Sequence, residues 1–359
     1  MENKKKAVLF ISQYPENVSP GQRFRFELYK QLMEENGFTI TTQSFFDDKG
    51  YNIIHEPGFI VAKTIAVAKG IYKRFSLLRS INKYDYIFLQ REAAPVGPPF
   101  FEWLYIKVFK KKLIYDFDDA IWRSQTPSEN RLANILKYTS KVKRICKWAY
   151  KVSCGNDYLC NYAKNYSNQI VYNPTCVDTE NRHNILANHN TERVEIGWTG
   201  SFSTLRYLDR IVPVLQQLQE QYDFDIKIIC NENPGYDLKN LTYVEWSEDN
   251  EVSELATCHI GLMPLLMDEW CEGKCGFKLI QYLALGIPAV SSPVGVNNII
   301  INHGTNGLLC YTDTEWYEAI EMLLLDKELR HKMGLAGREK VVKNYSLRSN
   351  SDVFISLFN

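Results

Sequence analysis

The sequence alternates short apolar runs with longer amphipathic stretches, and it does so in two successive series. The first series extends from residues 7–12 to residues 151–155, and the second from 194–198 to 289–292. Between them, residues 173–191 are polar, with Pro174, several asparagines and few large apolar side chains. Such alternation is typical of βαβ units, and the polar stretch is typical of a linker. The sequence therefore predicts an α/β fold of two Rossmann-like, doubly wound domains that face each other across a cleft.

The expected domains divide the 359 residues near the middle of the chain. We predict an N-terminal domain at residues 1–175 and a C-terminal domain at 176–345, both of ordinary size. A last helix at about 346–359 is expected to pack back onto the N-terminal domain. In open α/β sheets, ligands bind outside the carboxyl ends of the strands, so the loops at those ends are the candidate sites.

The periodicity predicts ten strands and six helices, followed by one more strand and two terminal helices. The strands are expected at 7–12, 38–45, 86–90, 112–117, 151–155, 194–198, 225–230, 242–245, 260–264 and 289–292, and the helices at 23–35, 100–110, 132–150, 205–222, 251–256 and 278–285.

The net charge of zero conceals a basic half and an acidic half. Residues 1–175 carry 27 Lys and Arg against 16 Asp and Glu, whereas residues 176–359 carry 15 against 26. The chain shows no secretory signal and no apolar run of about 18 residues. Its nine cysteines are scattered without metal-ligand spacing. These features predict a cytoplasmic protein with reduced thiols and no metal site.

Residues 272–295, EGKCGFKLIQYLALGIPAVSSPVG, combine two glycines with two lysines at a predicted helix start. Gly273 and Gly276 free the backbone just before a helix that begins near Phe277 or Lys278. Backbone N–H groups at a helix start attract anions, and Lys274 and Lys278 add positive charge. The segment therefore favours a diphosphate site, with an ordinary glycine turn bearing solvated lysines as the alternative.

A second candidate phosphate site is the strand-to-helix turn in IGWTGSFSTLRYL, residues 196–208. Its small and hydroxyl-bearing residues are able to bind phosphate oxygens. Helix capping without any ligand is the alternative. The residues concerned are Thr199, Gly200, Ser201, Ser203 and Thr204.

In the N-terminal half, Asp116, Asp118 and Asp119 stand at the end of a predicted central strand. Three adjacent carboxylates repel one another, which indicates a functional rather than a structural cluster. The loop at 14–25 follows the first strand, where Gly21 permits close backbone approach and Arg23 or Arg25 is a candidate phosphate ligand. A role in a helix or salt bridge is the alternative for its arginines, and for Arg91 after the strand at 86–90.

Two stretches of the basic half contain no acidic residue, namely residues 57–84 and 130–156. Basic amphipathic helices of this kind suit the surface of an anionic membrane. A solvated helix face remains an alternative. Nucleic acid is not expected, because no recognised binding module accompanies the charges.

The order of motifs in residues 170–345 resembles the donor domain of the family 4 glycosyltransferases, the glycosyl transferases group 1, which are retaining enzymes with the GT-B fold. The resemblance rests on a set of segments in the family's order, with thinner support from SPGQRFRFEL and LIYDFDDAIW in the N-terminal half. The segments are Asn173-Pro174 with Val177-Asp178, the turn at 197–204, the strand at 260–264, residues 272–295 and the Asn306-Gly307 turn.

The resemblance implies a retaining, hexosyltransferase-like enzyme. It would move a sugar from a nucleoside-diphosphate sugar, with UDP or GDP, to a saccharide or lipid-linked saccharide in cell-surface polysaccharide biosynthesis. No cofactor is implied. Asp118 and Asp119 would orient the sugar or accept the acceptor's proton, and Trp246 would stack on the base. The implied donor-binding set is Gly21, Arg23, Thr199, Gly200, Ser201, Ser203, Thr204, Trp246, Lys274, Gly276, Phe277, Lys278 and Gln281.

The chain departs from the family pattern at two points. The two usual glutamates, seven residues apart, fall on Gly273 and Gln281, with Glu272 one position early. The usual Arg and Lys near the turn at 197–206 are also absent. The pattern indicates a divergent branch, in which Gln281 would bind the ribose as a neutral amide. Two alternatives stay open at this point: a non-catalytic sugar-nucleotide-binding relative or partner subunit, and a GT-B sugar-nucleotide epimerase.

Overall fold

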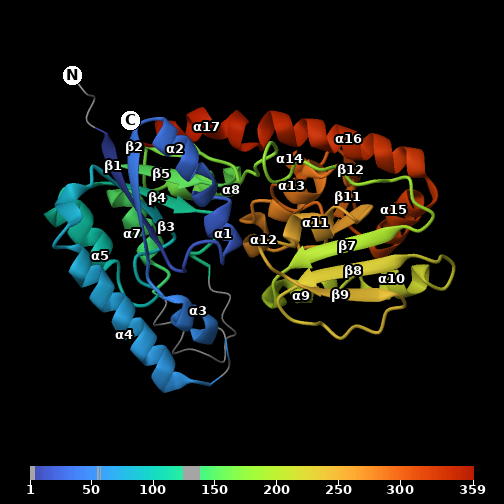
Figure 1. Ribbon diagram of the computed structural model, residues 1–359, viewed down its shortest axis with the longest axis horizontal. Helices are drawn as coiled ribbons and strands as arrows, with labels where there is room; N and C mark the ends of the chain where they lie inside the picture. The colour runs from blue at the N-terminus through green and yellow to red at the C-terminus, as the bar shows by residue number, and fades with distance from the viewer. Residues whose placement is uncertain (1–4, 55, 57, 124–137) are drawn as a thin grey trace. The chain divides into compact units, whose positions relative to one another are not determined.

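The computed structural model describes residues 5–54, 56, 58–123 and 138–359. The chain forms two compact units (Figure 1). Unit 1 comprises residues 1–174 together with 351–359, and unit 2 comprises residues 175–350. The expected helix at 132–150 and the basic stretch at 130–156 fall partly on residues 130–137, which lie outside the described residues.

Within the described residues, unit 1 contains a six-stranded parallel sheet in the order β2-β1-β3-β4-β5-β6. Its strands are β1 (Lys6–Ser12), β2 (Phe38–Ser44), β3 (Tyr86–Gln90), β4 (Lys112–Phe117), β5 (Lys151–Cys154) and β6 (Ile170–Tyr172). Its helical segments are α1 (Pro20–Arg23), η1 (Glu27–Tyr29), α2 (Lys30–Glu35), α3 (Asp48–Ile54), α4 (Ile60–Leu77), η2 (Ile81–Lys83), α5 (Phe100–Trp103), η3 (Leu104–Val108), α7 (Lys141–Trp148) and α8 (Asp157–Lys164).

Unit 2 repeats this architecture with a second six-stranded parallel sheet, in the order β12-β11-β10-β7-β8-β9. Its strands are β7 (Glu195–Gly200), β8 (Asp225–Cys230), β9 (Leu241–Glu245), β10 (Ile260–Met263), β11 (Ala289–Ser291) and β12 (Gly307–Leu309). Its helices are α9 (Phe202–Leu208), α10 (Val212–Leu218), α11 (Glu251–Leu255), α12 (Glu269–Glu272), α13 (Phe277–Ala284), α14 (Asn297–Ile300), α15 (Asp313–Leu325), α16 (Lys327–Asn344) and α17 (Leu347–Ser356), which crosses into unit 1 at residue 351.

The strands lie close to their expected positions, because strands buried on both faces read as continuous apolar runs. β3 is buried along its whole length, and β1 from residue 8 onward. The expectation of an α/β fold of two Rossmann-like, doubly wound domains is confirmed.

Two expected helices are broken in the structure, for different reasons. The helix at 23–35 is interrupted at Phe26, whose backbone leaves the helical region with φ −145° and ψ −31°. This brings the Phe26 ring onto Phe10 of β1, with ring centroids 4.9 Å apart. The helix at 205–222 is divided into α9 and α10, because Pro213 occupies the first turn of α10 and cannot continue a preceding helix.

The last residues of the chain supply core side chains to unit 1. Phe354 stacks on Tyr29 with ring centroids 3.9 Å apart, and Phe358 lies 6.4 Å from Phe10. The ammonium of Lys6 also donates to the carbonyl oxygen of Phe358 at 3.1 Å. Among the described residues, no helix combines the length and apolarity needed to cross a bilayer.

In each sheet, successive strands are first added on one side and then on the other, so the strand order reverses at one point. In unit 1 the order reverses between β1 and β3, and in unit 2 it reverses between β7 and β10. The carboxyl ends of strands flanking such a switch point are where doubly wound sheets bind ligands. We call the carboxyl ends of β1 and β3, with the loops that follow them, the favoured edge of unit 1. The carboxyl ends of β7 and β10, with their loops, are the favoured edge of unit 2.

Candidate functional site

The favoured edge of unit 2 brings together the turn after β7 and the start of α13. A Cβ atom at Gly200 would lie 2.7 Å from Nζ of Lys278, 2.7 Å from Oγ1 of Thr204 and 2.6 Å from the ring of Trp198. A residue with a side chain does not fit there. The two segments singled out in the sequence, 78 residues apart, thus meet at one place.

The Lys278 ammonium is held in an environment that disfavours its charge. It lies 5.0 Å from the centroid of the Trp198 ring. Within the described residues it forms no ion pair and no hydrogen bond. Burial, with a smaller contribution from the neighbouring Lys274 cation, lowers the pKa of Lys278 to about 7. A partly buried cation without a counter-charge is a candidate for an anion ligand.

The start of α13 is shaped by Gly276, which caps the helix with a left-handed backbone, φ +67°. A Cβ at this position would lie 2.2 Å from Cδ1 of Ile300, so space as well as conformation requires glycine. The first intrahelical bond runs from the amide of Ile280 to the carbonyl of Gly276 at 3.1 Å. The earlier N–H groups of a helix have no acceptor inside it and are suited to an anion.

Gln281 lies three residues after Lys278 and therefore on the same side of α13. Its side chain is completely buried, and neither Oε1 nor Nε2 has a hydrogen-bond partner among the described residues. The sequence predicts a ribose contact for this amide, and in this structure the amide has no exposed surface. Buried amides nearly always have partners, so the unsatisfied amide indicates a missing polar group.

The turn after β7 bonds mainly to itself. The hydroxyls of Ser201 and Ser203 lie 2.9 Å apart, and the Thr204 hydroxyl donates to the carbonyl of Ser201 at 2.8 Å. The buried Thr199 donates its amide to the Tyr282 hydroxyl at 3.1 Å, and this hydroxyl bonds the carbonyl of Leu262 at 3.2 Å. Tyr282 thus joins α13 to the ends of β7 and β10.

The remaining predicted donor residues lie on neighbouring segments. Lys274 places its ammonium 5.8 Å from the Tyr207 ring centroid and 5.9 Å from that of Trp270. Phe277, the first residue of α13, is half-buried. Trp246 is also half-buried, and its indole N–H donates to Oε1 of the buried Glu251 at 3.2 Å.

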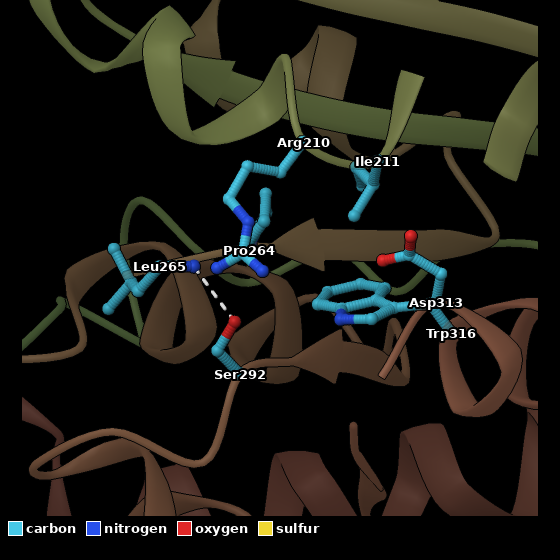
Figure 2. A pocket seen from close by; sticks show the side chains of 7 residues that line it. All are labelled: Arg210, Ile211, Pro264, Leu265, Ser292, Asp313 and Trp316. Carbon is cyan, nitrogen blue, oxygen red and sulfur yellow. Dashed lines mark hydrogen bonds between the residues drawn. The ribbon is translucent and has the colours of Figure 1, made fainter. Parts of the chain in front are cut away.

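A small pocket in unit 2 lies apart from these residues. Figure 2 shows Arg210 and Asp313 on either side of it, with the ring of Trp316 below Asp313. The amide of Leu265 donates to the Ser292 hydroxyl at 2.9 Å (Figure 2). The pocket has a volume of about 10 Å³, which is at the lower limit for one water molecule, so the pocket does not hold a nucleotide sugar.

At the favoured edge of unit 1, Arg91 binds both predicted catalytic carboxylates. Its Nε lies 3.0 Å from Oδ1 of Asp118, and its Nη2 lies 2.5 Å from Oδ2 of Asp119. The two carboxylates raise the pKa of Arg91. Arg91 has the left-handed φ of +63°, which is uncommon for a residue with a side chain and costs energy. Arg91 therefore combines a strained backbone with a guanidinium that binds two carboxylates.

Asp116 corrects the expectation drawn from three adjacent carboxylates. It is completely buried and paired with Arg25, whose Nε lies 3.2 Å and Nη2 2.5 Å from its two oxygens. Ser153 donates a further bond to Asp116 at 2.6 Å. Burial raises the pKa of Asp116, and the charge of Asp118 adds to this, so the predicted repulsion is present. It is countered by two arginines, because Arg25 pairs with Asp116 and Arg91 pairs with Asp118 and Asp119. Asp116 belongs to the interior of unit 1.

The loop after β1 approaches the same carboxylates. A Cβ at Gly21 would lie 2.9 Å from Oδ2 of Asp118, so glycine allows the close approach. Arg23 is buried, with its guanidinium 4.9 Å from the Phe24 ring centroid. Gly21 is thus beside the predicted catalytic residues, and Arg23 points into the protein rather than into solvent.

Sequence reasoning missed three residues of the unit 2 edge: Trp198, Tyr282 and Asn297. Trp198 faces the Lys278 ammonium, and Tyr282 joins the strand ends. Oδ1 of Asn297 is buried without a hydrogen-bond partner among the described residues and would lie 3.7 Å from a Cβ at Gly276. No local pattern marks them, because aromatic and amide side chains are equally common in cores and turns.

Comparison with known proteins agrees with this architecture. Residues 193–326 match the family described as glycosyl transferases group 1. No curated protein matches the sequence significantly. A sucrose-phosphate synthase from Thermosynechococcus elongatus is 14% identical, with a TM-score of 0.73 and 99% of each chain covered. A glycosyltransferase from Rickettsia africae is 12% identical, with a TM-score of 0.69 and coverage of 99% of this chain and 100% of that one.

A third similar structure is that of Anabaena HepE in complex with UDP and glucose. It is 12% identical, with a TM-score of 0.67 and 98% of each chain covered. At these identities the solved structures establish the fold. The chain therefore has the GT-B fold, and residues 193–326 of unit 2 are similar to the glycosyl transferases group 1.

Proposed function

We propose that the chain is a retaining transferase that moves a sugar from a nucleoside-diphosphate sugar to a saccharide or lipid-linked saccharide. We further propose UDP or GDP as the nucleotide and cell-surface polysaccharide biosynthesis as the process. The observation that carries the donor assignment is the Lys278 ammonium, which lies at the switch point of unit 2 and forms no ion pair with any residue that the structure describes. HepE, a protein of the same fold, was solved with UDP-glucose.

A diphosphate would satisfy several groups of this edge at once. Its charge would pair with Lys278 and Lys274, and its oxygens would accept from the backbone at the start of α13. The ribose would reach the unsatisfied amide of Gln281 once the ligand displaces the groups that cover it. The base would stack on Trp246. This arrangement supports a bound nucleoside diphosphate better than a solvated glycine turn, which leaves the buried amide of Gln281 unsatisfied.

The same groups would also assist the reaction. As the bond between the sugar and the diphosphate breaks, negative charge grows on the leaving phosphate, and fixed cations and helix N–H groups stabilise that charge. We propose that Asp118 or Asp119 accepts the proton of the acceptor hydroxyl or orients the sugar. Arg91 would hold both carboxylates fixed in direction.

The acceptor proposal rests on the basic half of the chain. We propose that the chain is cytoplasmic and touches the inner face of an anionic membrane through the basic segment at residues 57–84, where a lipid-linked saccharide is available. We do not extend the contact to the other basic stretch, 130–156, because its described helix Lys141–Trp148 exposes no large apolar side chain. In support, residues 57–84 contain no acidic side chain.

A thermal-shift screen against UDP-, GDP-, ADP- and CMP-sugars tests the donor assignment, because a ligand that binds only the folded state raises Tm. We expect one nucleotide to raise Tm. Lys278→Met should weaken its binding on the order of 10- to 100-fold, the usual loss for a hydrogen bond to a charged group. Lys332→Met, at an exposed lysine of α16, is the matched control. Absence of binding by every nucleotide, or equal loss in both variants, would refute the assignment.

A further inference from the structure

Helix α4 has two apolar faces, and only one of them is used inside the protein. The face packed against unit 1 consists of residues three or four apart, namely Ala66, Gly70, Arg74 and Leu77. A second apolar row, also with spacings of three and four, lies on the other side of the helix and is exposed. This row consists of Val61, Ile65, Ala68, Tyr72 and Phe75.

The inner face is firmly attached, so the outer face is a fixed surface. The buried guanidinium of Arg74 donates to the carbonyls of Ala93 and Ser12, each at 2.8 Å, and to that of Gln43 at 3.2 Å. Gly70 lies against the ring of Phe45, where a Cβ would approach to 2.3 Å. The helix is therefore tied to β1, to β2 and to the segment that follows β3, and it cannot turn its outer row inward.

The exposed row continues onto α5. The ring of Phe75 lies 6.1 Å from that of Phe100, which is 45% exposed, and Trp103 in the same helix is 42% exposed. Val61 is 74% exposed and Tyr72 is 68% exposed. We call this continuous surface the α4–α5 face; it comprises Val61, Ile65, Tyr72, Phe75, Phe100 and Trp103. Soluble proteins rarely expose so many large apolar side chains together without a partner.

The charge around the α4–α5 face selects the kind of partner. Lys69 lies on α4 beside the row, Lys73 lies one turn further along and closer to the packed side, and Lys107 follows α5. One carboxylate lies near the two α4 lysines, since the pKa of Asp47 is lowered by a backbone hydrogen bond from Gly50 and by the charges of Lys69 and Lys73. No acidic residue occurs between residues 57 and 84. A second copy of the chain would bring the same cations against these, which disfavours self-association through this face. An anionic lipid surface supplies both a negative layer for the lysines and an apolar layer for the row.

Helix α7, the described part of the other basic stretch, differs in this respect. Lys143, Arg144 and Lys147 are exposed, but none of its large apolar side chains is. Lys141 of the same helix is buried and bonds the carbonyl of Ala94 at 2.9 Å. The exposed side chains of α7 therefore form a basic surface that lacks large apolar groups. The α4–α5 face differs because it combines cations with exposed apolar groups.

We propose that the α4–α5 face binds the surface of an anionic bilayer, with α4 lying in the headgroup layer. The apolar row enters the boundary of the acyl chains, and the lysines pair with lipid phosphates. This proposal assigns a defined surface to the membrane contact of the proposed function. It depends on that membrane contact and on no other part of the proposed function. Its test requires no nucleotide sugar, so failure of the donor assignment would leave its result unchanged.

Co-sedimentation of the full chain with vesicles of phosphatidylcholine, with and without 30 mol% phosphatidylglycerol, tests the proposal. We expect binding to the anionic vesicles that weakens as salt is added. Combined Val61→Gln, Ile65→Gln and Tyr72→Gln should lower the affinity on the order of 100-fold, because three large apolar side chains no longer enter the bilayer. Glutamine keeps a good helix propensity, and an unchanged Tm shows that the fold persists.

The charge contribution is tested separately. Lys69→Gln with Lys73→Gln should lower the affinity on the order of 25-fold, from about fivefold for each lysine near a membrane surface. Lys143→Gln with Arg144→Gln on α7 is the matched control and should change it much less. Equal loss in the two pairs would overturn the proposal, as would absent binding to anionic vesicles. Self-association in sedimentation velocity that the triple variant abolishes would also overturn it, by assigning the face to a second copy.

Discussion

Raising the pH from 6 to 8 is expected to weaken the binding of a nucleoside-diphosphate sugar about tenfold, through the protonation of Lys278 alone. Burial lowers the pKa of this ammonium to about 7 in the free protein. A bound diphosphate stabilises the charged form and therefore raises the pKa in the complex. Affinity is thus fully present well below pH 7, the pKa of the free protein, and is lost as the pH rises toward the pKa of the complex.

The magnitude follows from the fraction of free protein in which Lys278 is charged. With a pKa of about 7 this fraction is about one half at pH 7 and about one tenth at pH 8. Each further pH unit costs about 1.4 kcal/mol of binding free energy until the pKa of the complex is reached. The donor does not contribute, because the diphosphate of a nucleotide sugar carries two ester bonds and has no titrating phosphate in this range.

Isothermal titration calorimetry at pH 6, 7 and 8, in buffers of different ionisation enthalpy, measures both the affinity and the proton uptake. We expect about half a proton to be taken up at pH 7 and more at pH 8. Lys278→Arg keeps its charge over this range and should bind with little pH dependence. Lys278→Met should raise the Tm of the free protein, because a poorly solvated cation is removed.

Two results would refute this reasoning. One is an affinity independent of pH between 6 and 8 for the unmodified chain. The other is the same pH dependence in Lys278→Arg, which would assign the titration to another group.

Three further predictions concern the rest of the molecule. Asp118→Asn should lower kcat on the order of 10²- to 10⁴-fold with little change in Tm, since Arg91 keeps its bond to the neighbouring carboxylate. Asp116→Asn should lower Tm by about 10 °C, because it leaves Arg25 charged and buried, a loss of about 3–5 kcal/mol. Stability should fall as the pH drops below about 6.5, the unfolded value for histidine, because burial lowers the pKa of His189 and His259 in the folded state, and urea unfolding at pH 7.5 and 5.5 measures this.

Each of these has an outcome that contradicts it. A fully active Asp118→Asn enzyme would remove that carboxylate from the reaction. An unchanged Tm in Asp116→Asn would show that the buried pair contributes no net stability. For the histidines, the acid-induced loss of stability should shrink in His189→Gln, and a loss of the same size would place its origin elsewhere.

The architecture and the strand positions were largely predictable from the sequence. β3, β4 and β8 begin and end at the predicted residues, because strands that are buried on both faces are predominantly apolar and end in polar loops. The helix start in the glycine and lysine segment at 272–295 was also predictable, because a positive φ favours glycine and a helix start has a local sequence pattern. These features depend on neighbours in the chain, and so a local pattern contains them.

What only the tertiary structure decided is which polar groups have partners. Asp116 and Arg25 are 91 residues apart, and their pairing changes the meaning of three carboxylates that look alike in the sequence. Lys278 owes its lowered pKa to burial beside Trp198, which belongs to a strand 80 residues earlier. Helix α4 carries an apolar row on each of two opposite sides, and only the packing shows which of the two rows is buried. Burial and charge pairing arise from contacts between distant segments, and periodicity within one segment does not encode them.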